Sequence, residues 1–132
     1  MSAIDFGEWV ASDLELKLGG HTYTVRPPTV EAAKMILAAA VMGEVHLGLV
    51  EGEVPPEVQA ILDSIGDEQP ALGEAHAAMV ADGLPAVNID RMAYYAVFYW
   101  ARGKEYADTL AKMMWLPRDL SPGIAGDAAP KG

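Results

Sequence analysis

The chain has 132 residues, of which 52% are hydrophobic and 21% charged, and these proportions fit one globular domain with a modest core. Its formal net charge of −10 argues against a nucleic-acid-binding surface and against binding to an anionic membrane. Because there are no cysteines, disulfides, thiolate catalysis and cysteine metal sites are excluded. No apolar run reaches the roughly 18 residues of a membrane span, and the acidic N-terminus does not resemble a signal peptide. We therefore expect a soluble, intracellular protein.

The first 25 residues predict a short lead-in followed by a β-hairpin. Residues 4–12 indicate an amphipathic lead-in, anchored by Phe6, Trp9 and Val10. Over residues 14–25, two runs of alternating apolar and polar residues flank a Gly-Gly pair, which is a hairpin pattern. Since a lone hairpin is only marginally stable in water, its leucine-bearing face should pack against the helices that follow.

Four to five helices are predicted after the hairpin. The first should begin after Thr29, which is a good N-cap, and end at Gly43. The expected helical ranges are about 30–42, 56–65, 71–82, 89–102 and 104–115. The fold class is therefore α+β and mainly α, with a single compact domain over residues 1–116. Residues 117–132 hold several prolines and glycines with few apolar residues, so we expect a flexible C-terminal tail.

The segment 88–103, NIDRMAYYAVFYWARG, is the centre of the predicted fold. Asn88 or Asp90 can cap its N-terminus, and Gly103 lies just past its last helical residue. Helical periodicity places one apolar set on a single face: Ile89, Met92, Ala96, Tyr99 and Trp100. The remaining face is not purely polar, and a helix that is apolar on most of its circumference is usually buried all round. In a chain this short, such burial can require a second protein.

No pattern in the sequence predicts catalysis, a cofactor or a metal ion. His21, His46 and His76 form none of the spacings of metal-binding histidine pairs. No serine lies in a nucleophile elbow, and Gly19-Gly20 precedes a strand without the lysine of a phosphate-binding loop. We therefore expect a protein that is not an enzyme and binds no cofactor.

A set of basic, aromatic and methionine side chains is the candidate partner-binding surface. Arginine beside aromatic residues at helical spacing is typical of interface anchors, and methionines provide an adaptable apolar surface. The same residues could instead pack within the chain against the last helix, and the sequence favours that alternative slightly. The candidate residues are Arg91, Tyr95, Phe98, Arg102, Met113 and Met114.

Two segments together resemble the tail assembly chaperones of siphophages and prophages of actinobacteria. The first is DLELKLGGHTYTVRPPTVEAA, a short hairpin that leads into a helix. The second is AYYAVFYWARGKEYADTLAKM, an aromatic-rich helix, then Arg-Gly, then a closing helix. The two segments cover about a third of the chain, and the middle, from Glu44 to Pro85, gives no support.

The resemblance implies a binding role in tail assembly. Such chaperones hold the long hydrophobic tape measure protein in the host bacterial cytoplasm until tail tube subunits polymerise around it, and they are absent from the mature virion. The family also makes a frameshifted long form, which would carry the contact with the tail tube protein, whereas this chain resembles the short form. Many copies would line one client, so weak homo-oligomerisation is expected. The high net charge would keep such an apolar-rich protein in solution.

The alternative interpretation is a structural virion protein, such as a tail terminator or a head–tail connector subunit. It would share the small size and the oligomerisation, but it would be found in purified particles. A small enzyme is disfavoured because no nucleophile–base or metal constellation is visible.

Overall fold

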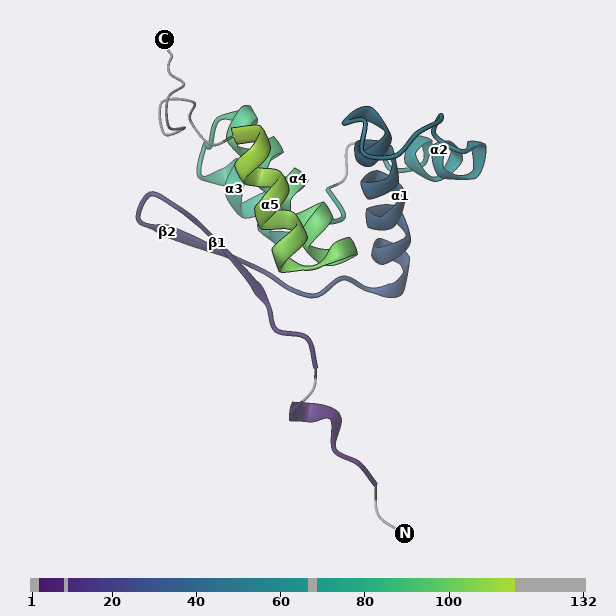
Figure 1. Cartoon of the computed structure of the whole chain (residues 1–132). Helices are drawn as coiled ribbons and strands as arrows, with labels where there is room; N and C mark the ends of the chain where they lie inside the picture. The colour runs from purple at the N-terminus through teal and green to yellow at the C-terminus, as the bar shows by residue number, and fades with distance from the viewer. Residues whose placement is uncertain (1–2, 9, 67–68, 116–132) are drawn as a thin grey trace.

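A computed structural model describes residues 3–8, 10–66 and 69–115. These residues form a 3-10 turn, η1 (Phe6–Glu8), a two-stranded sheet and five helices (Figure 1). The strands are β1 (Leu14–Leu18) and β2 (His21–Val25). The helices are α1 (Val30–His46), α2 (Pro56–Asp63), α3 (Glu74–Ala81), α4 (Ala86–Arg102) and α5 (Lys104–Trp115). The predicted α+β, mainly helical fold class is confirmed, whereas the predicted tail at 117–132 lies outside the described residues.

The hairpin forms where the alternating runs predict it. β1 and β2 pair antiparallel, with Leu14 opposite Val25 and Leu18 opposite His21. Gly19, the first of the two loop residues, has φ of +63°, a backbone conformation that glycine adopts without a Cβ clash. Because opposite residues share a face, the leucines of β1 and the apolar residues of β2 together form the side that meets the helices.

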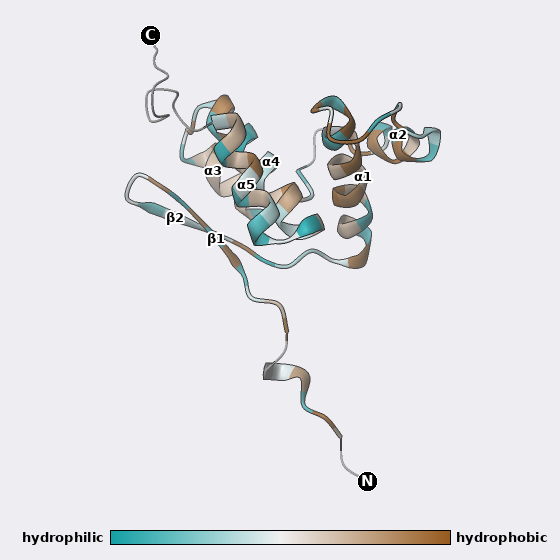
Figure 2. Cartoon of the chain, viewed as in Figure 1, coloured by the Kyte–Doolittle hydropathy of each residue, from teal (hydrophilic) through white to brown (hydrophobic). Residues whose placement is uncertain are grey.

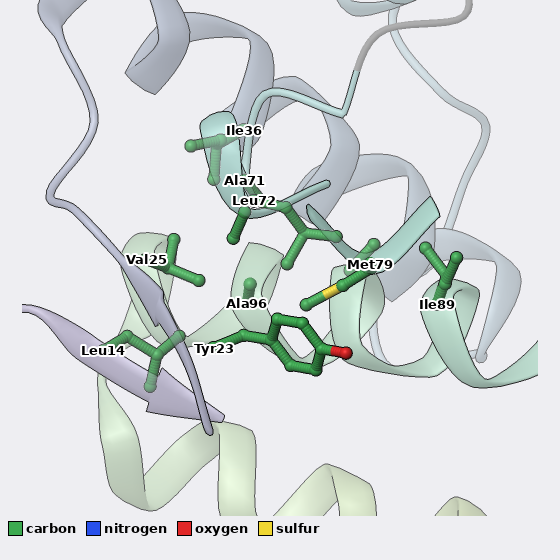
Figure 3. Close-up of a cluster of buried hydrophobic side chains, with 11 residues drawn as sticks. Leu14, Tyr23, Val25, Ile36, Ala71, Leu72, Met79, Ile89 and Ala96 are labelled. Atoms are coloured by element: carbon green, nitrogen blue, oxygen red, sulfur yellow. The ribbon is translucent and has the colours of Figure 1, made fainter. Parts of the chain in front are cut away.

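The main core lies between this hairpin face and the helices α1, α3 and α4. Figure 3 shows Leu14, Tyr23 and Val25 of the hairpin directed toward Leu72 and Met79. The other buried members of this cluster are Ile36, Ala71, Ala75, Ile89, Ala93 and Ala96. Met92, Tyr99 and Trp100 pack on its edge, so the five residues that periodicity placed on one face of the central helix do face this core.

Helix α1 is longer than predicted, because Gly43 lies inside it and Gly48 ends it. The N–H of Leu49 donates to the carbonyl of Glu44, and the N–H of Gly48 donates to that of Val45. This pair of bonds is the Schellman arrangement, and Gly48 occupies its left-handed position with φ of +79°. At its other end the helix is capped as predicted, since the Thr29 hydroxyl accepts from the N–H of Ala32.

Gly43 has a packing role instead. A Cβ at this position would lie 2.8 Å from the Tyr94 hydroxyl and 3.0 Å from Cζ of Phe98. The missing side chain therefore lets α1 approach α4 closely.

Helix α4 begins earlier than predicted and without the predicted cap. Its first residue is Ala86, its N-cap position is Pro85, and no side chain makes a capping hydrogen bond there. Asn88 and Asp90 are consequently inside the first turns of the helix. Proline suits this position because its φ is fixed near the helical value and it has no N–H to leave unpaired. The predicted end at Gly103 is confirmed.

The middle helices are shorter than predicted, and α2 lies at the periphery. Helix α2 ends at Asp63, and α3 begins at Glu74, after a turn that buries Ala71 and Leu72. α2 packs mainly on α1, and none of its residues is buried (Figure 1). Among the described residues, no helix is long and apolar enough to cross a membrane.

The N-terminal lead-in is exposed. Figure 1 shows residues 3–8 extending away from the helices and the hairpin. The exposed fractions of Ile4, Phe6 and Val10 are 67%, 63% and 66%. Phe6 and Val10, two of the three predicted anchors, are therefore not part of the buried core, and Trp9 lies outside the described residues.

Candidate partner-binding surface

A partly buried ion pair joins α1 to α4, and a tyrosine of α5 donates a hydrogen bond to it. The Arg102 guanidinium donates from Nε and Nη2 to the two carboxylate oxygens of Glu44, each at 2.9 Å. The Tyr106 hydroxyl donates to the same carboxylate at 2.7 Å. The Glu44 side chain is only 8% exposed and that of Arg102 is 33% exposed. Glu44 is the one buried charged residue in the described part of the chain.

The electrostatics of this cluster follow from its hydrogen bonds. The bonds from Arg102 hold the pKa of Glu44 below its ordinary value, although burial opposes them. Burial and the hydrogen bond to Glu44 together raise the pKa of Tyr106 to about 12. The cluster is therefore a carboxylate, a guanidinium and a neutral phenol at neutral pH, and all three hold helices together.

Phe98 belongs to the same junction. Its side chain is 1% exposed and lies in a second core cluster with Ala40, Ala107 and Leu110. Two of the six candidate partner-binding residues, Phe98 and Arg102, thus make contacts within the chain. Sequence reasoning missed Glu44, their common neighbour. In the sequence, Glu44 stands out as a lone acid next to the apolar run of α1. Because the predicted helix ended at Gly43, Glu44 was left outside it.

Tyr95 also bonds within the chain. Its hydroxyl donates to Asp108 at 2.5 Å, and Lys104 donates to the other oxygen of the same carboxylate at 2.6 Å. These contacts lower the pKa of Asp108, chiefly through Lys104, while burial and Asp108 raise the pKa of Tyr95. Tyr95 is partly buried and lines a groove beside β1.

Arg91 and the methionines differ from the others in their exposure. The Arg91 guanidinium lies 5.7 Å from the centre of the Trp115 ring, a cation–π contact at the surface. Met113 is 67% exposed, whereas Met114 packs on the second core cluster. The structure therefore divides the candidate set: Arg91 and Met113 are exposed, whereas Tyr95, Phe98, Arg102 and Met114 make contacts within the chain.

Sequence reasoning did not single out an exposed apolar segment that follows α1. Leu47, Leu49 and Val50 are 39%, 45% and 50% exposed, and we call these three residues the apolar loop. The Schellman bonds fix the backbone at Leu47 and Leu49, so these two side chains are presented by an ordered turn. Figure 2 shows hydrophobic colour along α1 and the segment that joins it to α2.

The described residues include no group of three or more His, Cys, Asp or Glu side chains that could hold a metal ion.

A family model for a domain of unknown function, DUF7426, matches residues 4–132. The chain belongs to the DUF7426 family. No curated protein and no solved structure matches this DUF7426 member. The family assignment covers the hairpin, all five helices and the apolar loop, and its description names no activity.

Proposed function

We propose that this chain is a non-catalytic tail assembly chaperone, which binds a hydrophobic tape measure protein in the bacterial cytoplasm and keeps it soluble. The two segments that resemble such chaperones correspond to the hairpin with the start of α1 and to most of α4 and α5. These elements build the core, so the resemblance lies in the part of the chain that determines the fold. We assign client binding to the apolar loop and to the exposed face of α1 beside it.

The observation that carries the proposal is the exposure of large apolar side chains on an ordered scaffold. Leu37 on α1 is 47% exposed, and the three residues of the apolar loop, which lie beyond the helix end, are 39%, 45% and 50% exposed. A holdase needs apolar surface that a client can cover, together with enough net charge to stay in solution uncovered. The chain combines both, with a formal net charge of −10.

Co-expression with the tape measure protein of the same genome tests the proposal. The variant Leu47→Ser/Leu49→Ser/Val50→Ser should reduce the soluble, co-purified client, because it removes apolar contact area without touching the buried core. Val80→Ser/Val87→Ser is the matched control, since these valines are 56% and 55% exposed on α3 and α4. Circular dichroism checks that both variants keep the helical content of the parent.

A client that stays insoluble with the unmodified chain would contradict the chaperone role. Detection of the chain in purified phage particles would instead favour a structural virion protein. Equal recovery of client with the two variants would leave the role in place but remove the apolar loop as its binding surface.

A further inference from the structure

A groove of about 590 Å³ runs along the outer edge of β1, between that strand and the helices α4 and α5. Its strand wall is made of the consecutive residues 13–17, so the groove follows the edge of the strand and not one of its faces. Within the described residues β1 pairs with β2 alone, which leaves its other edge without a strand partner. Unpaired backbone groups on such an edge can pair with a further extended segment.

The groove lining is mainly apolar, and its charged residues are three bases and two acids, Asp13 and Glu15. Its apolar lining is Leu14, Leu16, Met92, Tyr95, Tyr99, Ala111 and Trp115. Three of the nine basic residues of this acidic chain also line it, namely Lys17, Arg91 and Lys104. Among the described residues, neither Lys17 nor Arg91 forms an ion pair. An extended, acidic segment with apolar side chains would fit this lining.

The N-terminal arm, by which we mean residues 3–8 and 10–13, has this chemistry. Its apolar residues Ile4, Phe6 and Val10 are each more than 60% exposed. Residues 3–13 include three acids, Asp5, Glu8 and Asp13, and no basic residue. The arm also leaves the body of its own molecule (Figure 1). Residues 116–132, by comparison, contain two acidic and two basic residues, and so lack a net charge complementary to the groove.

We infer that the N-terminal arm of one copy occupies the groove of a second copy. Asp13 already lines one end of its own groove, and from there the arm runs outward. Ile4 lies nine positions before Asp13, so the arm reaches up to about 30 Å from its own domain when extended. The apolar side chains of the arm would cover Met92 and Trp115. Its acids would face Lys17 and Arg91, because Lys104 is already paired with Asp108.

This contact joins two different surfaces, and it therefore links copies head to tail. A head-to-tail contact closes into a ring or continues as an open chain, according to the rotation between neighbours. The inference concerns the chain by itself and does not require the proposed client. Arm–groove association can be present in a chain that fails to solubilise a tape measure protein, and absent in one that succeeds.

Sedimentation velocity over a wide concentration range tests the inference on the full chain. The arm variant Ile4→Ser/Val10→Ser and the groove variant Lys17→Glu/Arg91→Glu should each weaken self-association about tenfold or more. Val80→Ser/Val87→Ser is the control for the arm variant. Lys34→Glu/Lys112→Glu makes the same change of net charge at exposed positions outside the groove, and it is the control for the groove variant.

Mixing the two deficient variants gives the sharper result. The groove variant still has a working arm, and the arm variant still has a working groove, so an equimolar mixture should form a one-to-one complex and stop there. A parent chain that stays monomeric at every concentration would overturn the inference. Undiminished association of the arm variant, or a mixture of monomers only, would overturn it equally, because the occupant of the groove would then not be the arm of another copy.

Discussion

At the scale of single residues, the Glu44 carboxylate is the group whose burial most needs its neighbours. Removing Arg102 would leave that carboxylate charged and largely buried, with only the Tyr106 hydroxyl as a partner. We expect Arg102→Met to lower the free energy of unfolding by about 2 kcal/mol, less than the cost of breaking a fully buried ion pair, because the Arg102 side chain is 33% exposed. Urea denaturation followed by circular dichroism measures this.

Two comparisons make that prediction specific. Lys104→Met breaks an ion pair whose lysine is 71% exposed, so it should cost under about 1 kcal/mol. The double variant Glu44→Gln/Arg102→Met leaves no buried charge and should be less destabilised than Arg102→Met alone. If the double variant loses as much free energy of unfolding as the two single variants added together, Glu44 and Arg102 are not coupled.

The same carboxylate predicts part of the acid sensitivity of the fold. Its pKa in the folded state lies below the ordinary value of 4.5, because Arg102 and Tyr106 donate hydrogen bonds to it. This stabilisation is fully present above pH 4.5 and is lost as the pH falls through the lower, folded pKa. Melting temperatures between pH 7 and pH 3 should therefore fall less steeply below pH 4.5 for Glu44→Gln than for the parent. If the two plots of melting temperature against pH are parallel, Glu44 is not a source of the stability lost in acid.

At the scale of elements, the contact between α1 and α4 depends on a glycine inside a helix. Gly43→Ala would place a Cβ 2.8 Å from the Tyr94 hydroxyl, and Phe98, at 3.0 Å, is buried and has little room to move. Overpacking of this kind typically costs 1–3 kcal/mol, and the better helix propensity of alanine returns about 0.5–1 kcal/mol. We therefore expect a net loss of about 1 kcal/mol in the free energy of unfolding, measured by urea denaturation.

Gly20→Ala is the control for this prediction. An added Cβ there meets nothing within 4 Å, and Gly20 is not among the glycines with positive φ. It should therefore change stability little. A stabilised Gly43→Ala variant would mean that α1 and α4 can separate at no cost, which would contradict the close approach described above.

The elements also show what the sequence could predict and what it could not. Alternation and periodicity, which are local, predicted the hairpin and the five helices. The C-terminus of α1 and the N-terminus of α4 were misplaced, because glycine and asparagine occur both at helix ends and inside helices. Gly43 resembles a helix terminus until Tyr94 and Phe98 are known to lie against it, and Asn88 resembles a cap until Pro85 takes that position.

The candidate site was less predictable than the fold, for the same reason. The ion pair of Glu44 and Arg102 joins residues 58 positions apart, and no local pattern connects them. Helical spacing grouped Arg91 with Phe98 and Arg102, but it could not say which of them would meet α1. The apolar loop was also hidden, because its importance lies in exposure, which only the tertiary structure gives.

At the scale of the whole molecule, the protein has a small ordered core with two kinds of exposed apolar surface. The apolar loop beside α1 is assigned to a client, and the arm with its groove is assigned to neighbouring copies. The two surfaces involve different residues. A chaperone that coats a long client would bind it more tightly with both kinds of contact, since weak sites gain affinity when many copies are linked along one chain.

This separation makes a prediction of its own. The arm variant Ile4→Ser/Val10→Ser keeps the apolar loop, so it should still bind the client, but more weakly because each copy binds alone. The ratio of chaperone to client in the co-purified complex, measured by quantitative gel densitometry, should fall. A complete loss of client binding would instead place the arm in the client-binding surface itself.

The most direct test of the central claim is size-exclusion chromatography with light scattering, on the chain alone and after co-expression with the tape measure protein of the same genome. The account predicts a stable complex, in which several copies of the chain hold one soluble tape measure protein. A chain that elutes at the same mass with and without that client, while the client stays insoluble, would contradict the proposed chaperone function.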